Sequence, residues 1–111
     1  MCVTNLIVHA LEALADPTRL RIVELLAEGD RSAGELAASF AVSRPAVSRH
    51  LRVLREHGLV RSRPQAQRRV YSLDPTPLAE LDEWLARYRP FWAQRLDALE
   101  TELHRARKES R

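Results

Sequence analysis

Arginine offers the most evident chemistry in this sequence, and it is concentrated in the middle of the chain. Residues 43–70 contain eight arginines and a single acidic residue, which gives this segment a net charge of +7. Residues 1–42 carry a net charge of −3, and residues 71–111 carry −1. A guanidinium group can pair with two acceptor atoms at once, on a phosphate or on the edge of a guanine. The basic block therefore predicts a polyanionic partner, with a plain solvated surface as the alternative.

A helix that begins at residue 43 or 44 and ends at Gly58 is predicted to carry four of these arginines. Val47, Leu51 and Leu54 recur at steps of four and three residues, so they share one face that is expected to point into the core. The remaining faces carry mainly arginine, serine and small residues, which suit the base edges and phosphates of a DNA groove. The DNA contacts expected on this helix are Ser43, Arg44, Pro45, Ala46, Ser48, Arg49, His50 and Arg52.

A β-hairpin is predicted after this helix. Residues 59–63 and 69–73 alternate loosely between apolar and polar side chains, and the segment that connects them is polar and basic. Arg68 and Arg69 are expected to contact phosphates or the minor groove, where a narrow groove strengthens the potential that an arginine feels. The two arginines of the first strand are expected to meet phosphates or simply to be exposed.

Three helices are predicted before residue 43. Thr4 is expected to cap the first helix, and Asp16 the second, which ends at Gly29. Ser32 and Glu35 have the spacing of a capping box, which predicts a short third helix. Two short helices joined by a tight turn and followed by a basic hairpin are the parts of a winged helix-turn-helix. The expected fold is therefore mainly α with a small β-hairpin.

A long apolar stripe at helical spacing follows the hairpin and extends over about 25 residues. Pro90 lies inside it and removes one helical hydrogen bond, so the helix is expected to kink there or to break into two pieces. The stripes of the first and last helices exceed what a small core can absorb, which predicts that both helices form a dimer interface. The last stripe consists of Leu78, Leu81, Leu85, Tyr88, Trp92, Leu96, Leu99 and Leu103.

Three segments of the chain resemble the ArsR family of bacterial winged-helix repressors. They are residues 13–22 (ALADPTRLRI), residues 43–60 (SRPAVSRHLRVLREHGLV) and residues 68–73 (RRVYSL). These motifs stand in the right order, and the resemblance extends over residues 5–100. It implies a homodimer bound to double-stranded DNA at a palindromic operator, with the first and last helices packed across a two-fold axis. It also implies repression, since a dimer that covers a promoter obstructs polymerase.

Many members of the family that the chain resembles release DNA on binding a metal ion, through a cysteine pair on the third helix or an Asp/His set on the last helix. The third-helix region here has no cysteine or histidine, and the residue two positions after Asp82 is Trp84. His50 and His57 are seven residues apart, roughly 10 Å along a helix axis, which is too far to share one ion. His50 is expected to pack or to contact phosphate, and His57 to be a cation at the helix C-terminus. No metal ligand, cofactor or inducer is assigned.

Three sensing sites remain open as alternatives. Two copies of Cys2 near a dimer axis could form a disulfide or bind a thiophilic metal, although an inert N-terminus is the ordinary interpretation. Glu100 and His104, one helical turn apart, could form half of a metal site completed by a second subunit, or simply be an exposed pair. The aromatic residues of the last helix could line a pocket for an organic inducer, or be plain dimer core.

Other classes of protein fit the sequence poorly. It has no glycine-rich phosphate loop, no HExxH motif and no nucleophile with an evident base, so no enzyme is predicted. Its apolar runs are far shorter than the ~20 residues that cross a bilayer, and a single cysteine fits a reducing cytoplasm. We expect one domain over residues 1–111. The alternative function is a winged-helix docking module that binds protein instead of DNA.

Overall fold

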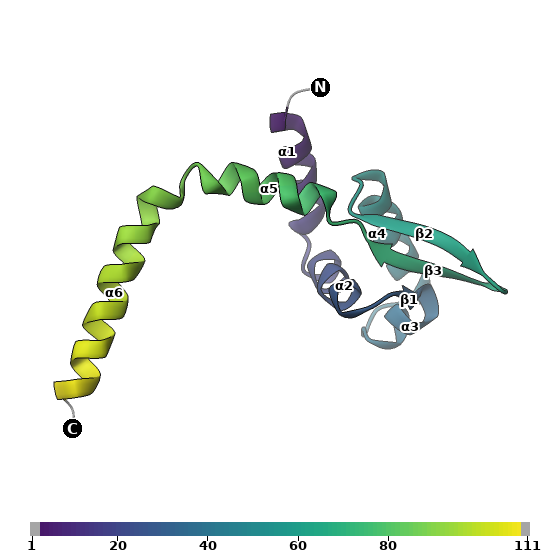
Figure 1. Cartoon of the computed structure of the whole chain (residues 1–111). Helices are drawn as coiled ribbons and strands as arrows, with labels where there is room; N and C mark the ends of the chain where they lie inside the picture. The colour runs from purple at the N-terminus through teal and green to yellow at the C-terminus, as the bar shows by residue number, and fades with distance from the viewer. Residues whose placement is uncertain (1–2, 110–111) are drawn as a thin grey trace. The chain divides into compact units, whose positions relative to one another are not determined.

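The computed structural model describes residues 3–109, which form six helices and one three-stranded sheet (Figure 1). The chain divides into two compact units, residues 1–81 and residues 82–111. The elements are α1 (Val3–Leu14), α2 (Pro17–Glu28), β1 (Arg31–Ser32), α3 (Ala33–Ala38), α4 (Arg44–Glu56), β2 (Val60–Gln65), β3 (Arg68–Leu73), α5 (Thr76–Ala86) and α6 (Arg89–Glu109).

Local capping interactions explain where α2 and α3 begin. The Asp16 carboxylate caps α2 by accepting the backbone N–H of Arg19, as the sequence predicts. The capping box of α3 is also confirmed: Ser32 Oγ accepts the N–H of Glu35, and the Glu35 carboxylate accepts the N–H of Ser32. The predicted cap at Thr4 is wrong, because α1 already includes that residue.

The core of the first unit is built from α1, α2, α3, α4 and the base of the hairpin. The largest fully buried side chains are Ile22, Leu36, Val47, Leu51, Leu54 and Leu59. The three predicted inner residues of α4 are among them, so the expected orientation of that helix is confirmed. Each buried leucine or valine contributes ~1.5–3 kcal/mol by leaving water, which holds α4 in one rotation about its axis.

The sheet has the order β1-β3-β2, and all its pairs are antiparallel. The predicted hairpin is confirmed, but its strands extend further toward the tip than residues 59–63 and 69–73. Gln65 pairs with Arg68, so only Ala66 and Gln67 form the turn, with Ala66 at a φ of 57°. Pro64 is tolerated in β2 because an edge strand does not need every N–H. Figure 1 shows the hairpin extending past the neighbouring helices.

Strand β1 was not predicted from the sequence. It has two residues, Arg31 opposite Tyr71 and Ser32 opposite Val70. A segment this short has no periodicity of its own, and it becomes a strand only because β3 supplies hydrogen-bonding partners 38 to 40 residues later in the chain.

The long C-terminal helix is interrupted, as Pro90 predicts. Helix α5 ends at Ala86 and α6 begins at Arg89, with Pro90 in the first turn, where its missing N–H leaves no helical bond unmade. Tyr88 donates its N–H to the carbonyl of Leu85 in the short connection. None of the helices that the structure describes combines the length and apolar character needed to cross a membrane.

Candidate nucleic-acid interface

The outer face of α4 is positioned by its buried face. Ser43 caps the helix, its Oγ accepting the N–H of Ala46, and the burial of Val47, Leu51 and Leu54 turns the basic side chains outward. An open hollow on this outer face is lined by Pro45, Ser48, Arg49 and Arg52. All four of these residues are exposed. The structure therefore gathers four of the sequence-predicted DNA contacts at one surface.

Three of the four arginines of α4 have no hydrogen-bond or ion-pair partner within residues 3–109, and none of the four has an acidic one. The three are Arg44, Arg49 and Arg52, and each has an exposed side chain. A guanidinium group without a partner can bind a phosphate or a guanine without first breaking an ion pair. Arg55, one turn further along, donates instead to Ser62 Oγ of β2 at 3.3 Å.

A second hollow joins the start of α4 to the hairpin. Arg44 lines it together with Arg68 and Arg69 of β3, and with Ser32 and Gly34 near the start of α3. Three arginines from two elements therefore line one space. This arrangement suits a phosphate group, whose several oxygens can accept from more than one arginine.

The arginines of the hairpin are bound to neighbouring side chains. Arg61 Nε lies 3.0 Å from Asp74 Oδ2, Arg63 Nη1 2.9 Å from Asp30 Oδ2, and Arg68 Nη1 3.5 Å from Glu35 Oε1. Arg69 donates to Ser62 Oγ at 3.1 Å. Both first-strand arginines are exposed, and their expected contact with phosphates stays a prediction. Each of them also has an acidic partner that sequence spacing did not indicate.

Hydrogen bonds hold two of these acidic partners in the ionised form. The pKa of Asp74 is lowered mainly by the backbone N–H of Thr76, with a smaller effect from the Arg61 guanidinium. The pKa of Glu35 is lowered mainly by the backbone N–H of Ser32, and Arg68 adds to this effect. Backbone N–H groups therefore lower the pKa of both carboxylates more than the arginines do.

His50 lies in different surroundings from the rest of the predicted site. Its side chain is half-buried, and its Nδ1 lies 3.9 Å from the Asp16 carboxylate and 3.5 Å from Arg19 Nη1. Arg19 in turn donates to the carbonyl of Ala13 at 2.7 Å. These contacts connect α4 to the start of α2, which fits packing, one of the two roles expected of His50, while its contact with DNA stays a prediction.

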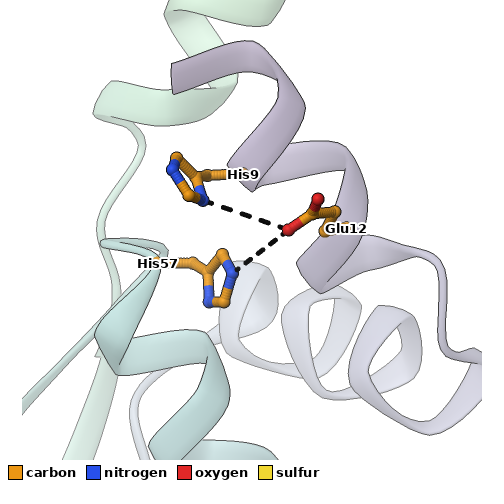
Figure 2. A group of neighbouring side chains, drawn as sticks. All are labelled: His9, Glu12 and His57. Atoms are coloured by element: carbon orange, nitrogen blue, oxygen red, sulfur yellow. Dashed lines mark ion pairs between the residues drawn. The ribbon is translucent and has the colours of Figure 1, made fainter. Parts of the chain in front are cut away.

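Three further side chains lie together in the structure, although the sequence did not indicate that they would. His9 and Glu12 of α1 lie beside His57, which follows the last residue of α4 (Figure 2). Their ligand atoms all lie within 4.8 Å of one another. His9 and His57 are 48 positions apart in the sequence, so no local spacing could have indicated this group.

Comparison with known proteins places these features in one family. The family model for the bacterial regulatory protein, arsR family, matches residues 16–62, which include α2, α3, α4 and the start of β2. The HTH-type transcriptional regulator Rv2034 of Mycobacterium tuberculosis is 54% identical over 88 residues, 79% of this chain and 79% of that protein. The transcriptional repressor SdpR of Bacillus subtilis is 34% identical over 80 residues, 72% of this chain and 89% of that protein.

A solved structure agrees with the sequence matches. An ArsR-like transcriptional regulator from Rhodococcus sp. RHA1 superposes with a TM-score of 0.71 at 32% identity, covering 88% of this chain and 92% of that chain. The expected winged helix-turn-helix fold is confirmed by this likeness and by the helix and strand order described above. The individual DNA-contacting residues stay predictions.

Proposed function

Because the chain belongs to the arsR family of bacterial regulatory proteins, we propose that it is a homodimeric repressor, acting in the cytoplasm, that places α4 in the major groove of a palindromic DNA site. The observation that carries the proposal is the exposed face of α4, where Arg49 and Arg52, without an acidic partner within residues 3–109, lie opposite the fully buried face. The relatives are transcriptional regulators, which favours this function over a docking module that does not bind DNA.

Within this proposal the predicted contacts have different tasks. Ser48, Arg49 and Arg52 lie together at the hollow on α4 and are assigned to base edges. Arg44, Arg68 and Arg69 surround the second hollow and are assigned to phosphates, which fix the register of the protein on DNA. Ser43, Pro45 and Ala46 form the first turn of α4 around its cap, where small side chains allow close approach to the DNA.

The second subunit is inferred from apolar surface on α1 and α6. Leu96, Leu99 and Leu103 of α6 each keep more than half of their surface exposed, and they recur at helical spacing. On α1, Leu6 and Leu11 are also exposed. Apolar stripes of this kind are typical of interfaces, and the commonest solution is a two-fold dimer that buries the same surface of both copies.

Repression follows from the size of such a dimer on DNA. Two copies of α4 related by a two-fold axis read two half-sites about one helical turn apart, so the dimer covers a stretch of promoter. A bound dimer then excludes polymerase without further machinery. The similarity to SdpR, a transcriptional repressor, supports this direction of regulation.

Binding to DNA from upstream of the gene, compared with a scrambled duplex over a salt series, tests the proposal. The upstream duplex should bind at least about 10³-fold more tightly at physiological salt. Both affinities should fall as salt rises, by ~0.9 in log–log slope for each phosphate contact. Equal affinities for the two duplexes at every salt concentration would argue against a sequence-specific regulator.

The dimer is tested separately by sedimentation of the Leu99→Glu, Leu103→Glu double variant. Two charges in the apolar stripe of α6 should convert a dimer to a monomer, because burying a charge in an apolar interface is costly. Arg105→Glu is the matched control, because at about 100° per residue it lies on the opposite face of α6. A double variant that sediments like the unsubstituted protein would remove α6 from the interface.

A further inference from the structure

We propose that His9, Glu12 and His57 form a binding site for a divalent transition-metal cation of the zinc class. His9 and Glu12 are three residues apart on α1, and His57 follows the end of α4. Figure 2 shows the three side chains converging on one space between the two helices. All three lie in the unit formed by residues 1–81, so the site needs no second chain.

The ligand types match this class of ion. Two imidazoles and one carboxylate are the set that zinc takes in sites with three protein ligands and one open position. Imidazole nitrogen favours zinc, copper and nickel, whereas calcium and magnesium prefer all-oxygen surroundings. One glutamate and two neutral histidines leave a net charge of +1 around a bound divalent ion, so the ion is largely compensated.

The distances leave room for an ion between the side chains. Glu12 Oε2 lies 4.0 Å from His9 Nδ1 and 3.9 Å from His57 Nε2, too far for a hydrogen bond in either case. A tetrahedral zinc ion with ligands at ~2.0–2.2 Å places neighbouring ligand atoms roughly 3.3–3.5 Å apart. The atoms are therefore slightly further apart than a bound ion requires, and rotation of the exposed His9 and Glu12 side chains closes the difference.

His57 is already oriented as a ligand. Its Nδ1 lies 2.8 Å from the carbonyl oxygen of Val53, which can only accept, so Nδ1 carries the proton and donates it. The lone pair of the neutral ring is then on Nε2, the atom that faces Glu12. A histidine that donates one ring N–H to a backbone carbonyl while the other nitrogen binds the ion is the usual arrangement at metal centres.

The site also has an open side. A hollow beside the histidines is lined by Leu6, His9, Glu56, His57, Gly58 and Pro77. It gives solvent access to the side of the cluster where the two histidines lie. A water molecule can complete four-fold coordination.

A bound ion would join α1 to the end of α4. His57 keeps only 22% of its side-chain surface exposed, whereas His9 and Glu12 keep 56% and 62%, so the ion would join two exposed side chains to a packed one. Because an ion held by the folded unit alone stabilises that unit by mass action, zinc should raise its unfolding temperature. This inference is independent of whether the protein represses transcription.

The test is titration of the full chain with Zn²⁺ by calorimetry, followed by thermal unfolding with and without the ion. We expect one Zn²⁺ per chain and a higher unfolding temperature in its presence. Co²⁺ as an optical probe should give the intense visible bands of a tetrahedral site. His9→Gln, Glu12→Gln and His57→Gln should each lower the affinity by at least about tenfold, since even changes outside the ligand shell do so.

His104→Gln and Cys2→Ser are the matched controls, because each removes an imidazole or a thiol that is not one of the three proposed ligands. Both should bind Zn²⁺ as the unsubstituted protein does. The exposed His9→Gln variant keeps the test decisive if His57→Gln folds poorly. The proposal is overturned if the unsubstituted protein binds no Zn²⁺, if His9→Gln and Glu12→Gln bind it unchanged, or if a control variant loses it.

Discussion

The arginines of α4 and those of the hairpin have opposite surroundings. Arg49 and Arg52 extend from the outer face of a helix whose other face is buried, and neither has an acidic partner within the described residues 3–109. Arg61 and Arg63 belong to a strand at the edge of the sheet and pair with Asp74 and Asp30 at 3.0 and 2.9 Å. Arginine thus lacks an acidic partner on the outer face of α4 but is ion-paired on the first strand of the hairpin.

This difference separates two ways of positioning a positive charge. Core packing holds the backbone of α4, so its guanidinium groups need no acid to direct them and are available to DNA. The hairpin has little core beneath its outer half, where β2 is exposed from Arg63 to Gln65, and its arginines are directed by acids instead. Exposed ion pairs contribute only ~0–1 kcal/mol each, so a phosphate can replace an acidic partner at small cost.

The largest predicted effect comes from the core beneath α4. Leu54→Ala should lower the free energy of unfolding by ~2–5 kcal/mol, because Leu54 is fully buried and its loss leaves a cavity. Chemical denaturation measures the change, with Leu103→Ala on α6 as a control at a half-exposed leucine. A loss below ~1 kcal/mol would mean that packing does not hold the arginines of α4 in place.

A smaller effect is expected from the reading face itself. Arg49→Ala should weaken the preferred DNA site by ~1–3 kcal/mol and random DNA by less, because a bidentate base contact discriminates between sequences. Competition binding on both duplexes gives the comparison, and Arg105→Ala of α6 serves as the control for loss of one positive charge. An equal loss on both duplexes would make Arg49 a phosphate contact like those assigned to the hairpin.

Removing the Ser32 cap of α3, which positions Glu35 beside the hairpin, should have an effect comparable to or smaller than that of Arg49→Ala. Ser32→Ala should lower the free energy of unfolding by ~0.5–2 kcal/mol, since it removes the side chain that caps α3. Thermal or chemical denaturation at neutral pH detects this change. Ser39→Ala at the other end of α3, where the hydroxyl only donates to the carbonyl of Glu35, should cost less.

The capping box of α3 also predicts that the stability of the protein depends on pH in the acid range. The pKa of Glu35 in the folded protein lies below its ordinary value of 4.5, so its contribution to stability is present above that value and is lost as the pH falls through the lowered pKa. Glu35→Gln should therefore be less stable than the unsubstituted protein at neutral pH, and the difference should shrink below about pH 4.5. A difference that stays constant with pH would exclude this linkage.

The smallest predicted effect concerns the paired arginines. Asp30→Asn removes the acidic partner of Arg63 and should tighten binding to random DNA modestly, with a log–log salt slope steeper by up to ~0.9 if the freed guanidinium reaches a phosphate. Glu24→Gln, which frees Arg21 on α2, is the matched control. An unchanged slope for Asp30→Asn would show that Arg63 lies away from DNA.

Most of the helical structure could be predicted from the sequence, because its causes are local. The buried face of α4 follows from the three- and four-residue spacing of Val47, Leu51 and Leu54, and the capping box of α3 needs only residues 32–35. The Thr4 cap fails as a prediction because a capping residue type near a helix start does not mark the first turn by itself. The ends of the hairpin strands near the tip could not be predicted, because the residues there are polar and exposed and show no alternation between buried and exposed side chains.

The sequence by itself determined which residues form the inner and outer faces of α4, where α2 and α3 are capped, and where Pro90 interrupts the last helix. Only the tertiary structure decided which charges are paired, since Arg63 meets Asp30 across 33 positions and Arg68 meets Glu35 across 33 as well. It also decided that β1 exists and that His57 lies beside His9 and Glu12. The physical reason is range: periodicity and capping act over a few residues, whereas ion pairs, strand partners and ligand clusters depend on where the folded chain returns.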